Sequence, residues 1–485
     1  MRYPDWAVIL VYLAGITWFG ARFRRKQRTL KDYFLGGRAA PWWAIALSIV
    51  SAETSTLTII GTPALAFAGN LGFLQVVLGY LLARLVIALL FLPHYFRGEL
   101  YTAYELIGNR FGVRARRLTA GTFLVLRALA EGVRVFAISI VVSIVLGTGE
   151  LASILLIVGL TLFYTFEGGM TAVIWTDVVQ MLLYVAGAVV SLVVILQHIS
   201  GGWGTVWAVA GAAGKLQVFD FRFAFTLEFF SRTYSFWAGL IGGCFLTTAS
   251  HGTEQLLVQR LLSARNLKES RAALLGSWVV IFVQFSMFLF IGLTLYVFYA
   301  QAKLPAPQPA DRIYPDFVWR YLPPGVSGLI VAAILAAAMS NLSAALNSLA
   351  STTVMDFYKP LATLRGAPRT ESHYLRMART ATLVWGGILL GTGYVAQQWG
   401  SVLEAGLSIA SVIYGSLLGV FLLGVLTRRV RENAAMVGMV TGLAAMVAVK
   451  LYTPIAWTWY VLIGTVVTFA TGCLASWLAG EGRNA

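Results

Sequence analysis

The sequence predicts an all-α membrane protein with about 13 transmembrane helices. Of its 485 residues, 59% are hydrophobic and only 12% are charged, and the mean hydropathy is +0.78. Soluble proteins are about half apolar and about a quarter charged. The apolar residues also gather in runs of about 20, the length that an α-helix needs to cross a bilayer.

These apolar runs follow one another along the whole chain. The first is not a secretory signal, because its basic cluster follows the apolar residues instead of preceding them. Cys244 and Cys473 fall inside runs, so we expect small buried thiols and neither a disulfide nor a thiolate metal site. The approximate limits of the runs are 4–22, 41–68, 70–95, 119–146, 149–166, 169–198, 234–260, 272–300, 326–352, 379–398, 402–426, 434–452 and 455–478.

Lys and Arg gather in alternate connections between the runs. The net charge of +16 therefore indicates membrane topology and not a nucleic-acid surface. By the positive-inside rule the basic connections are cytoplasmic, which places the N-terminus outside and the C-terminus in the cytoplasm of a multi-pass plasma (inner) membrane protein. We expect a single chain to be the functional unit. The basic connections are 22–38, 97–117, 260–271, 359–379 and 428–431.

Two of the runs are interrupted by polar residues near their middle. "SIVSAETSTLTIIGTPALAFAG" (48–69) is polar from Ser51 to Thr58 and then contains Gly61 and Pro63; "CFLTTASHGTEQLLVQR" (244–260) carries the second interruption. Irregular backbone inside a membrane is tolerated only where protein or a water-filled cavity surrounds it. Either break alone is explained equally well by a kink that neighbouring helices satisfy.

The two breaks open two sets of five runs whose topologies are opposed. This pairing is typical of secondary transporters, which bind solute near the membrane midplane between inverted repeats. We therefore expect an extra N-terminal helix with a basic loop (1–40), a first repeat (41–198), an extracellular connection (199–233), a second repeat (234–426) and two C-terminal helices (427–485).

A third polar stretch, "AAAMSNLSAALNS" (336–348), lies in the run 326–352. At about 100° per residue, Ser340, Ser343 and Asn347 share one narrow arc of a helix, with Asn341 and Ser348 beside it. Small residues let another helix approach closely. Hydroxyl and carbonyl oxygens also suit a hard cation such as Na⁺, and an unwound helix opposite would supply carbonyls.

Five segments together resemble the sodium:solute symporter family, and they extend over most of the chain. The resemblance implies a leucine-transporter-like inverted repeat of five plus five helices with flanking helices. It also implies Na⁺-coupled symport of a small organic solute into the cell by alternating access. The segments are "YELIGNRFG" (104–112), "EGGMTAVIWTDVVQ" (167–180), "GTEQLLVQR" (252–260), "AAAMSNLSAALNSLASTTVMDFYKP" (336–360) and "GSLLGVFLLGVLTRR" (415–429).

The resemblance implies a Na⁺ site made by the backbone carbonyls of Ser51, Thr54 and Ala337 together with Ser340 and Asn341. The family usually has Ser or Thr at the last position. An Asn amide oxygen can bind Na⁺, but its NH₂ group repels a cation.

Some members bind a second Na⁺, which the resemblance places at Asp177 and Ser343; here Ala344 stands where a second hydroxyl is usual. An ion pair with a neighbouring helix is the alternative role for Asp177.

The resemblance implies that polar residues of the broken helices and of their neighbours bind the solute. A sugar, an organic acid, an amino acid or a vitamin-like solute all remain open as substrates. The implied residues are Glu53, Thr58, Gln75, Thr247, Ser250 and His251.

Further charged residues lie inside predicted spans. Arg127, Glu131 and Arg134 share one helix face. They form an internal ion-pair ladder, or the spare cation pairs with Asp177 or Glu53 or attracts an anionic substrate. Arg84 is open to the same interpretations.

Other function classes lack their sequence signatures. The chain has no His-Glu-x-x-His, no glycine-rich phosphate loop and no Gly-x-Ser-x-Gly, so we expect no enzyme. A channel would show a repeated selectivity-filter motif or rings of like charge, and neither appears in the sequence. A Na⁺-independent or H⁺-coupled carrier of the same fold, or a transporter-like solute sensor, remains the alternative.

Overall fold

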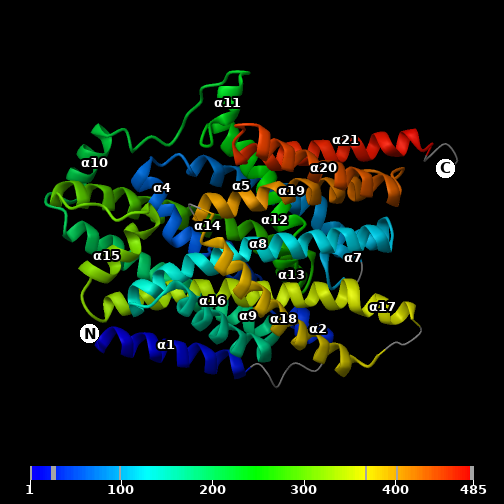
Figure 1. Ribbon diagram of the computed structural model, residues 1–485, viewed down its shortest axis with the longest axis horizontal. Helices are drawn as coiled ribbons and strands as arrows, with labels where there is room; N and C mark the ends of the chain where they lie inside the picture. The colour runs from blue at the N-terminus through cyan, green and yellow to red at the C-terminus, as the bar shows by residue number, and fades with distance from the viewer. Residues whose placement is uncertain (1–2, 23–28, 98–99, 366–368, 400–401, 481–485) are drawn as a thin grey trace.

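The structure is a computed structural model that describes residues 3–22, 29–97, 100–365, 369–399 and 402–480, and it is built from helices throughout this part of the chain (Figure 1). The long axis of the molecule runs along most of the helices. Helix α1 begins at one end of this axis and α21 ends at the other. The side chains of residues 17, 21, 30, 31, 163–169, 333, 336, 337, 340 and 404 lie outside the described residues.

A helix or a broken helix lies at each predicted apolar run. Helix α9 covers both 149–166 and 169–198, which the sequence predicts as separate spans. The longer helices are α1 (Tyr3–Ala21), α3 (Trp42–Glu53), α5 (Leu74–Val86), α8 (Val113–Leu146), α9 (Glu150–Gln197), α14 (Leu267–Ala302), α16 (Val326–Thr352), α18 (Glu371–Ala396), α19 (Val402–Leu426), α20 (Glu432–Tyr452) and α21 (Tyr460–Leu478). Shorter ones are α4 (Thr62–Ala68), α7 (Ala103–Arg110), α10 (Gly202–Ala212), α11 (Leu227–Ser231), α12 (Gly243–Gly252), α13 (Gln255–Leu262), α15 (Ile313–Tyr321) and α17 (Lys359–Leu364).

Within the described residues, 7 helices are long and apolar enough to cross a membrane, and one bent pair makes up to 8. The helical segments on either side of a break are each too short to cross a membrane, so they are not counted when length is the criterion. The total of about 13 spans therefore stays a prediction.

The first broken helix consists of α3, a π-helical turn η3 (Leu57–Gly61) and α4, and its two parts are bent by 62°. Helix α3 ends at Glu53, inside the polar stretch 51–58, and helical backbone begins again at Leu57. Pro63 lies within this second part, just after η3 passes into α4. Proline removes one backbone hydrogen bond inside a helix, which fits the irregular turn before it.

The second broken helix consists of a π-helical turn η5 (Ala238–Gly242), α12 and α13. It breaks at Thr253 and Glu254, and Glu254 has extended backbone with φ −86° and ψ 129°. The break thus falls inside "GTEQLLVQR", as the sequence predicts.

Glycines allow each broken helix to pack closely against the backbone of a neighbouring helix. A Cβ on Gly243 of α12 would lie 2.3 Å from Val76 O on α5. A Cβ on Gly292 of α14 would lie 2.0 Å from Pro63 O on α4. Helices in membranes associate through such small residues, and these contacts hold α12 against α5 and α4 against α14.

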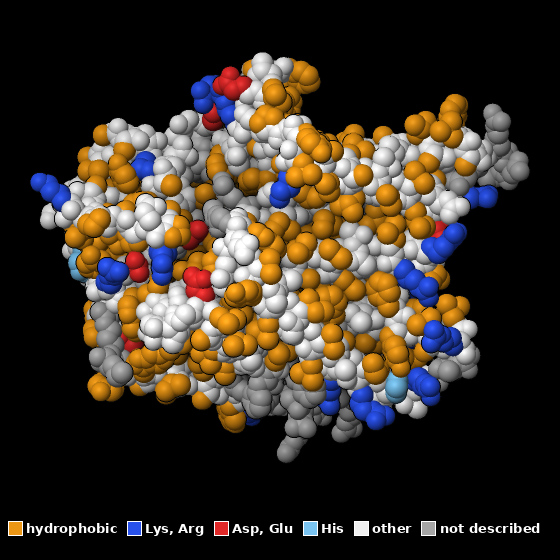
Figure 2. Space-filling view, viewed as in Figure 1, with side chains coloured by type: hydrophobic (Ala, Val, Ile, Leu, Met, Phe, Trp, Pro, Cys, Tyr) orange, Lys and Arg blue, Asp and Glu red, His pale blue; other side chains and the backbone are white. Residues whose placement is uncertain are grey.

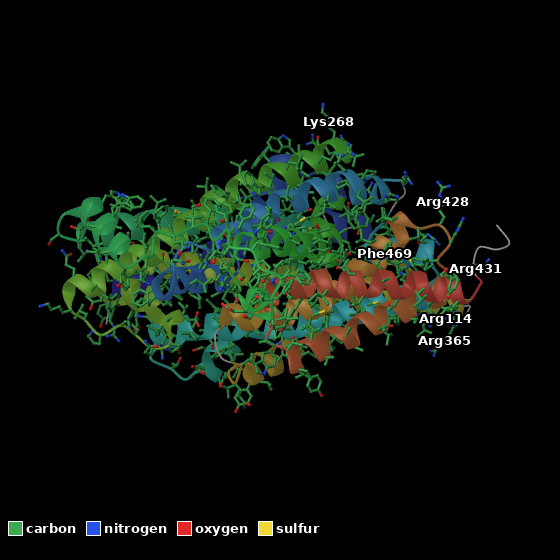
Figure 3. All side chains as sticks on the ribbon, turned by 90° about the horizontal axis from the view of Figure 1, so that it is seen from above. Arg114, Lys268, Arg365, Arg428, Arg431 and Phe469 are labelled. Atoms are coloured by element: carbon green, nitrogen blue, oxygen red, sulfur yellow. The ribbon has the colours of Figure 1, made fainter. Side chains whose placement is uncertain are left out.

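The surface agrees with a membrane-spanning body. Figure 2 shows hydrophobic side chains spread over the flank of the molecule. Lys and Arg side chains are most numerous at the right-hand end, and others lie at the left end and the top, near Asp and Glu. Figure 3 labels Arg114, Arg365, Arg428 and Arg431 at the right-hand end, where α7, α17 and the end of α21 lie.

Candidate functional site

A cavity lies between the two helix breaks. Its wall combines both broken helices with α8, α14 and α19. Five of the predicted solute residues belong to it: Glu53, Thr58, Thr247, Ser250 and His251. An apolar wall that carries a few polar side chains is typical of sites for small organic ligands.

Gln75 lies outside this cavity wall. Its Nε2 donates to the carbonyls of Gly72 and Tyr234 at 3.1 and 3.2 Å, and its Oε1 accepts from the amide of Asp220 at 2.9 Å. With all its hydrogen-bonding atoms engaged by backbone, Gln75 fixes the connection before the second broken helix.

Glu53 links the ends of the two broken segments. Its Oε2 lies 2.6 Å from Arg84 Nη2 on α5 and 3.3 Å from His251 Nε2 at the end of α12. The hydroxyl of Ser250 lies 2.9 Å from His251 Nδ1. Arg84 is fully buried and also donates to Ser277 Oγ at 3.1 Å. Arg84 is therefore the counter-ion of Glu53.

A second ion-pair network lines the opposite part of the cavity. Arg127 lies 2.6 Å from Glu131 on its own helix and 3.0 Å from Glu254 at the break of the second broken helix. Tyr414 of α19 donates to the other oxygen of Glu254. The ladder is therefore present, and its partner beyond α8 is Glu254. Neither arginine of this ladder pairs with Glu53 or Asp177. Glu53 pairs with Arg84, and Asp177 pairs with Arg260.

Arg134 lies on the cavity wall at the outer end of this ladder. Its Nη1 lies 3.0 Å from Glu131 Oε2, the same oxygen that Arg127 contacts. Its side chain is 22% exposed, against 2% for Arg127. Arg134 Nε is buried without a hydrogen-bond partner. One carboxylate oxygen thus serves two guanidinium groups that both line the cavity, and Arg134 is the more exposed of the two.

Asp177 forms an ion pair with a neighbouring helix. Its Oδ2 lies 2.9 Å from Arg260 Nη2 of α13 and 2.5 Å from Ser48 Oγ of α3. Ser343, the other residue of the expected second Na⁺ site, has a buried hydroxyl without a hydrogen-bond partner. The sequence alone gave no sign that Arg260 would be the partner, because it lies 83 residues away.

The predicted Na⁺ ligands from α3 meet α16 through Asn341. Beyond the end of α3, the amide of Ser55 donates to Glu53 O and that of Thr58 donates to Ser55 O. The carbonyls of Ser51 and Thr54 accept from Asn341 Nδ2 at 3.4 and 3.3 Å. The side chains of Ala337 and Ser340 lie outside the described residues.

Comparison with known proteins agrees with this arrangement. The family model described as the sodium:solute symporter family matches residues 33–442. The chain is 28% identical to the sodium/sialic acid symporter SiaT of Proteus mirabilis, over 97% of this chain and 94% of that protein. It is 29% identical to the sodium-coupled monocarboxylate transporter 2 of Bos taurus, over 96% and 75% of the two chains.

Among solved structures, the chain resembles a substrate-bound, outward-open state of a Na⁺-coupled sialic acid symporter. The TM-score is 0.89 with 27% identity, and 98% of each chain is covered. The fold is the leucine-transporter-like fold, and the matched relatives are carriers, not enzymes. The chain therefore belongs to the sodium:solute symporter family and is a Na⁺-coupled symporter of a small solute.

Proposed function

We propose that this symporter uses the Na⁺ gradient to take up a small organic anion whose carboxylate pairs with Arg134. The observation that carries the proposal is the position of Arg134 on the cavity wall, sharing one oxygen of Glu131 with Arg127. A guanidinium group binds a carboxylate through two parallel hydrogen bonds when its donors are available. Sialic acids and monocarboxylates, named for the relatives above, both carry a carboxylate.

The remaining charges of the cavity do not require a cationic solute. Glu53 is neutralised by Arg84, and Glu131 and Glu254 are balanced by Arg127 and Arg134. A buried acid without a counter-ion, which a cationic solute would need, is thus missing among the described cavity residues. The hydroxyls of Thr58, Thr247 and Ser250 offer neutral hydrogen bonds to the rest of the solute.

For the ion, we propose a site formed by the carbonyls of Ser51, Thr54 and Ala337, with Ser340 and Asn341 from α16. Neutral oxygens of this kind suit Na⁺. The convergence of two α3 carbonyls on the Asn341 amide supports the position of the site. Na⁺ bound there would join α3 to α16.

We propose a single Na⁺ per cycle. Asp177, the acid of the second expected site, is paired with Arg260, and both side chains are fully buried. A second cation at Asp177 and Ser343 would have to displace this guanidinium group. That displacement opposes a second ion.

The proposed topology places the N-terminus outside and the C-terminus in the cytoplasm. The gathering of Arg114, Arg365, Arg428 and Arg431 at one end supports this orientation (Figure 3). We retain the division into 1–40, 41–198, 199–233, 234–426 and 427–485, and one chain as the functional unit.

Alternating access follows from the two broken helices. Na⁺ and solute bind beside the breaks from outside, and each stabilises the same arrangement of α3, α8 and α16. Coupling arises because both ligands have higher affinity for that state than for the other. The ion pair of Arg127 with Glu254 joins α8 to α13, so opening towards the cytoplasm must break or shift it.

A thermal-shift screen of the purified protein tests the proposed substrate class. The melting temperature is measured with a panel of small carboxylates, each beside its neutral amide, in NaCl and in choline chloride. A ligand that binds the folded state raises the melting temperature. We expect at least one carboxylate to do so only in NaCl, while its amide does not. Stabilisation by neutral or cationic solutes alone would contradict the proposal.

A further inference from the structure

We propose that the side-chain amide of Asn341 takes the place of Na⁺ when the ion is absent, and that Na⁺ binding requires this amide to rotate. The inference rests on the Na⁺ site proposed above. It concerns the departure from the usual Ser or Thr at this position, and it assigns Asn341 the role of setting the Na⁺ affinity.

The first observation is where the amide NH₂ points. Asn341 Nδ2 lies 3.4 Å from Ser51 O and 3.3 Å from Thr54 O. Two carbonyl oxygens that converge on one point repel each other unless a cation or a donor lies between them. An NH₂ group has two donors and satisfies both carbonyls, whereas the hydroxyl of Ser or Thr has only one. The amide therefore links α3 to α16 without an ion.

The second observation concerns the other half of the same side chain. Asn341 is 1% exposed, and its Oδ1 is buried without a hydrogen-bond partner among the described residues. A buried acceptor without a partner costs free energy, so this orientation of the amide is not fully satisfied. A half-turn about the last side-chain bond would turn Oδ1 towards the carbonyls of Ser51 and Thr54.

The two orientations have opposite preferences for the ion. With NH₂ towards the carbonyls, a cation is repelled and its place is taken. With Oδ1 towards them, three oxygens converge, and this arrangement is stable only with a cation between them. Na⁺ must therefore displace two hydrogen bonds of the amide, which lowers its affinity relative to a site with a hydroxyl.

The neighbouring α16 residue Asn347 provides a matched control. It is 2% exposed and lies on the same helix, and no described contact joins it to Ser51 or Thr54. Its Oδ1 and Nδ2 are both buried without hydrogen-bond partners. Asn347→Ser thus removes a buried amide from α16 without touching the carbonyls.

The test is Na⁺ titration of the purified full-length protein, followed by intrinsic tryptophan fluorescence and by the melting temperature, with choline chloride holding the ionic strength. We expect Asn341→Ser to bind Na⁺ about five- to tenfold more tightly than the wild type, since two weak hydrogen bonds no longer compete. Its melting temperature without Na⁺ falls, and its rise on adding Na⁺ is larger. We expect the same behaviour of Asn341→Thr, which replaces Asn341→Ser in the test if that variant does not fold. Asn347→Ser should bind Na⁺ like the wild type.

Unchanged or weaker Na⁺ binding by both Asn341→Ser and Asn341→Thr would overturn the inference. So would an equal gain in Asn347→Ser, because the effect would then come from loosening of α16. Ser340→Ala separates this result from failure of the site itself. If Ser340→Ala binds Na⁺ as the wild type does, the ion lies elsewhere, and both the site and the role of Asn341 are rejected.

Discussion

Arg260 of α13 and Asp177 of α9 form an ion pair of 2.9 Å in which both side chains are fully buried. Ser48 of α3 contacts both partners, donating to Asp177 at 2.5 Å and accepting from Arg260 Nε at 2.9 Å. The pair therefore joins the two broken helices to α9 below the proposed ion site.

Removal of Arg260 should destabilise the protein strongly. Arg260→Gln leaves Asp177 charged and buried without its cation, which costs about 3–5 kcal/mol. The measurement is thermal or denaturant unfolding in detergent, followed by tryptophan fluorescence. The double variant Arg260→Gln with Asp177→Asn removes both charges and should recover part of the loss. Equal losses in the single and double variants would show that the ion pair is not the cause.

Substitution of Arg134 should affect the solute and not the ion. Arg134→Gln removes the charge proposed to bind the carboxylate, so the KM for the solute should rise about 100-fold, in line with loss of a charged hydrogen-bonded pair. The Na⁺ affinity should change little. Arg134→Lys keeps the charge but not the paired donors, so its KM for the solute should lie between those of the wild type and Arg134→Gln.

The control for this prediction is Arg222→Gln. Arg222 pairs with Asp220 in the connection before α11, and its side chain is 71% exposed. Its loss should leave uptake unchanged. A KM for Arg134→Gln equal to that of the wild type would reject the proposed carboxylate contact.

Asp5 caps α16 from the neighbouring helix α1. Its Oδ1 accepts from the amides of Gly325 and Gly328 at 2.6 and 2.7 Å and from Ser327 Oγ at 2.8 Å. A carboxylate at a helix N-terminus satisfies amides that have no partner in the helix. Asp5→Ala should lower the free energy of unfolding by about 2 kcal/mol. Asp5→Asn keeps an acceptor and the side-chain volume and should lose less; equal losses in the two variants would show that a neutral acceptor does not cap α16.

Asp356 should make the stability depend on pH. It lies in η7 (Thr353–Tyr358), beyond the predicted span 326–352, with Arg116 Nε at 2.6 Å and Thr102 Oγ1 at 3.0 Å. Burial raises the pKa of Asp356 from 3.8 to about 7, although Arg116 opposes the shift. Its Oδ2 is buried without a hydrogen-bond partner among the described residues, so a proton can sit there while Arg116 stays on Oδ1.

The folded protein therefore holds a proton on Asp356 between pH 3.8 and about 7 that the unfolded chain has released. Stability from this group is fully present below pH 3.8 and is lost as the pH rises to about 7, by up to about 1.4 kcal/mol per pH unit. Melting temperatures measured across this range should show the decline in the wild type and a smaller one in Asp356→Asn. A parallel decline in both proteins would assign it to other groups.

Sequence patterns predicted the fold because the constraint on a membrane helix is severe. A break in an apolar run is visible as polar residues, and both breaks lie where the residues place them. The sequence does not show which residues pair with the buried charges. Arg127 meets Glu254, and Arg84 meets Glu53, through the packing of helices distant in the chain. A polar residue beside a break also need not face the cavity, and Gln75 binds backbone carbonyls instead.

Uptake into proteoliposomes tests whether the protein couples Na⁺ to the transport of a small carboxylate. Purified protein is reconstituted, and uptake of a labelled small carboxylate that stabilises the protein is followed under an inward Na⁺ gradient, with an equal K⁺ gradient as the control. We expect accumulation above equilibrium with Na⁺, none with K⁺, and loss of accumulation in Arg134→Gln. Uptake that is equally fast in K⁺, or an active carrier that accumulates only neutral solutes, would contradict the proposal.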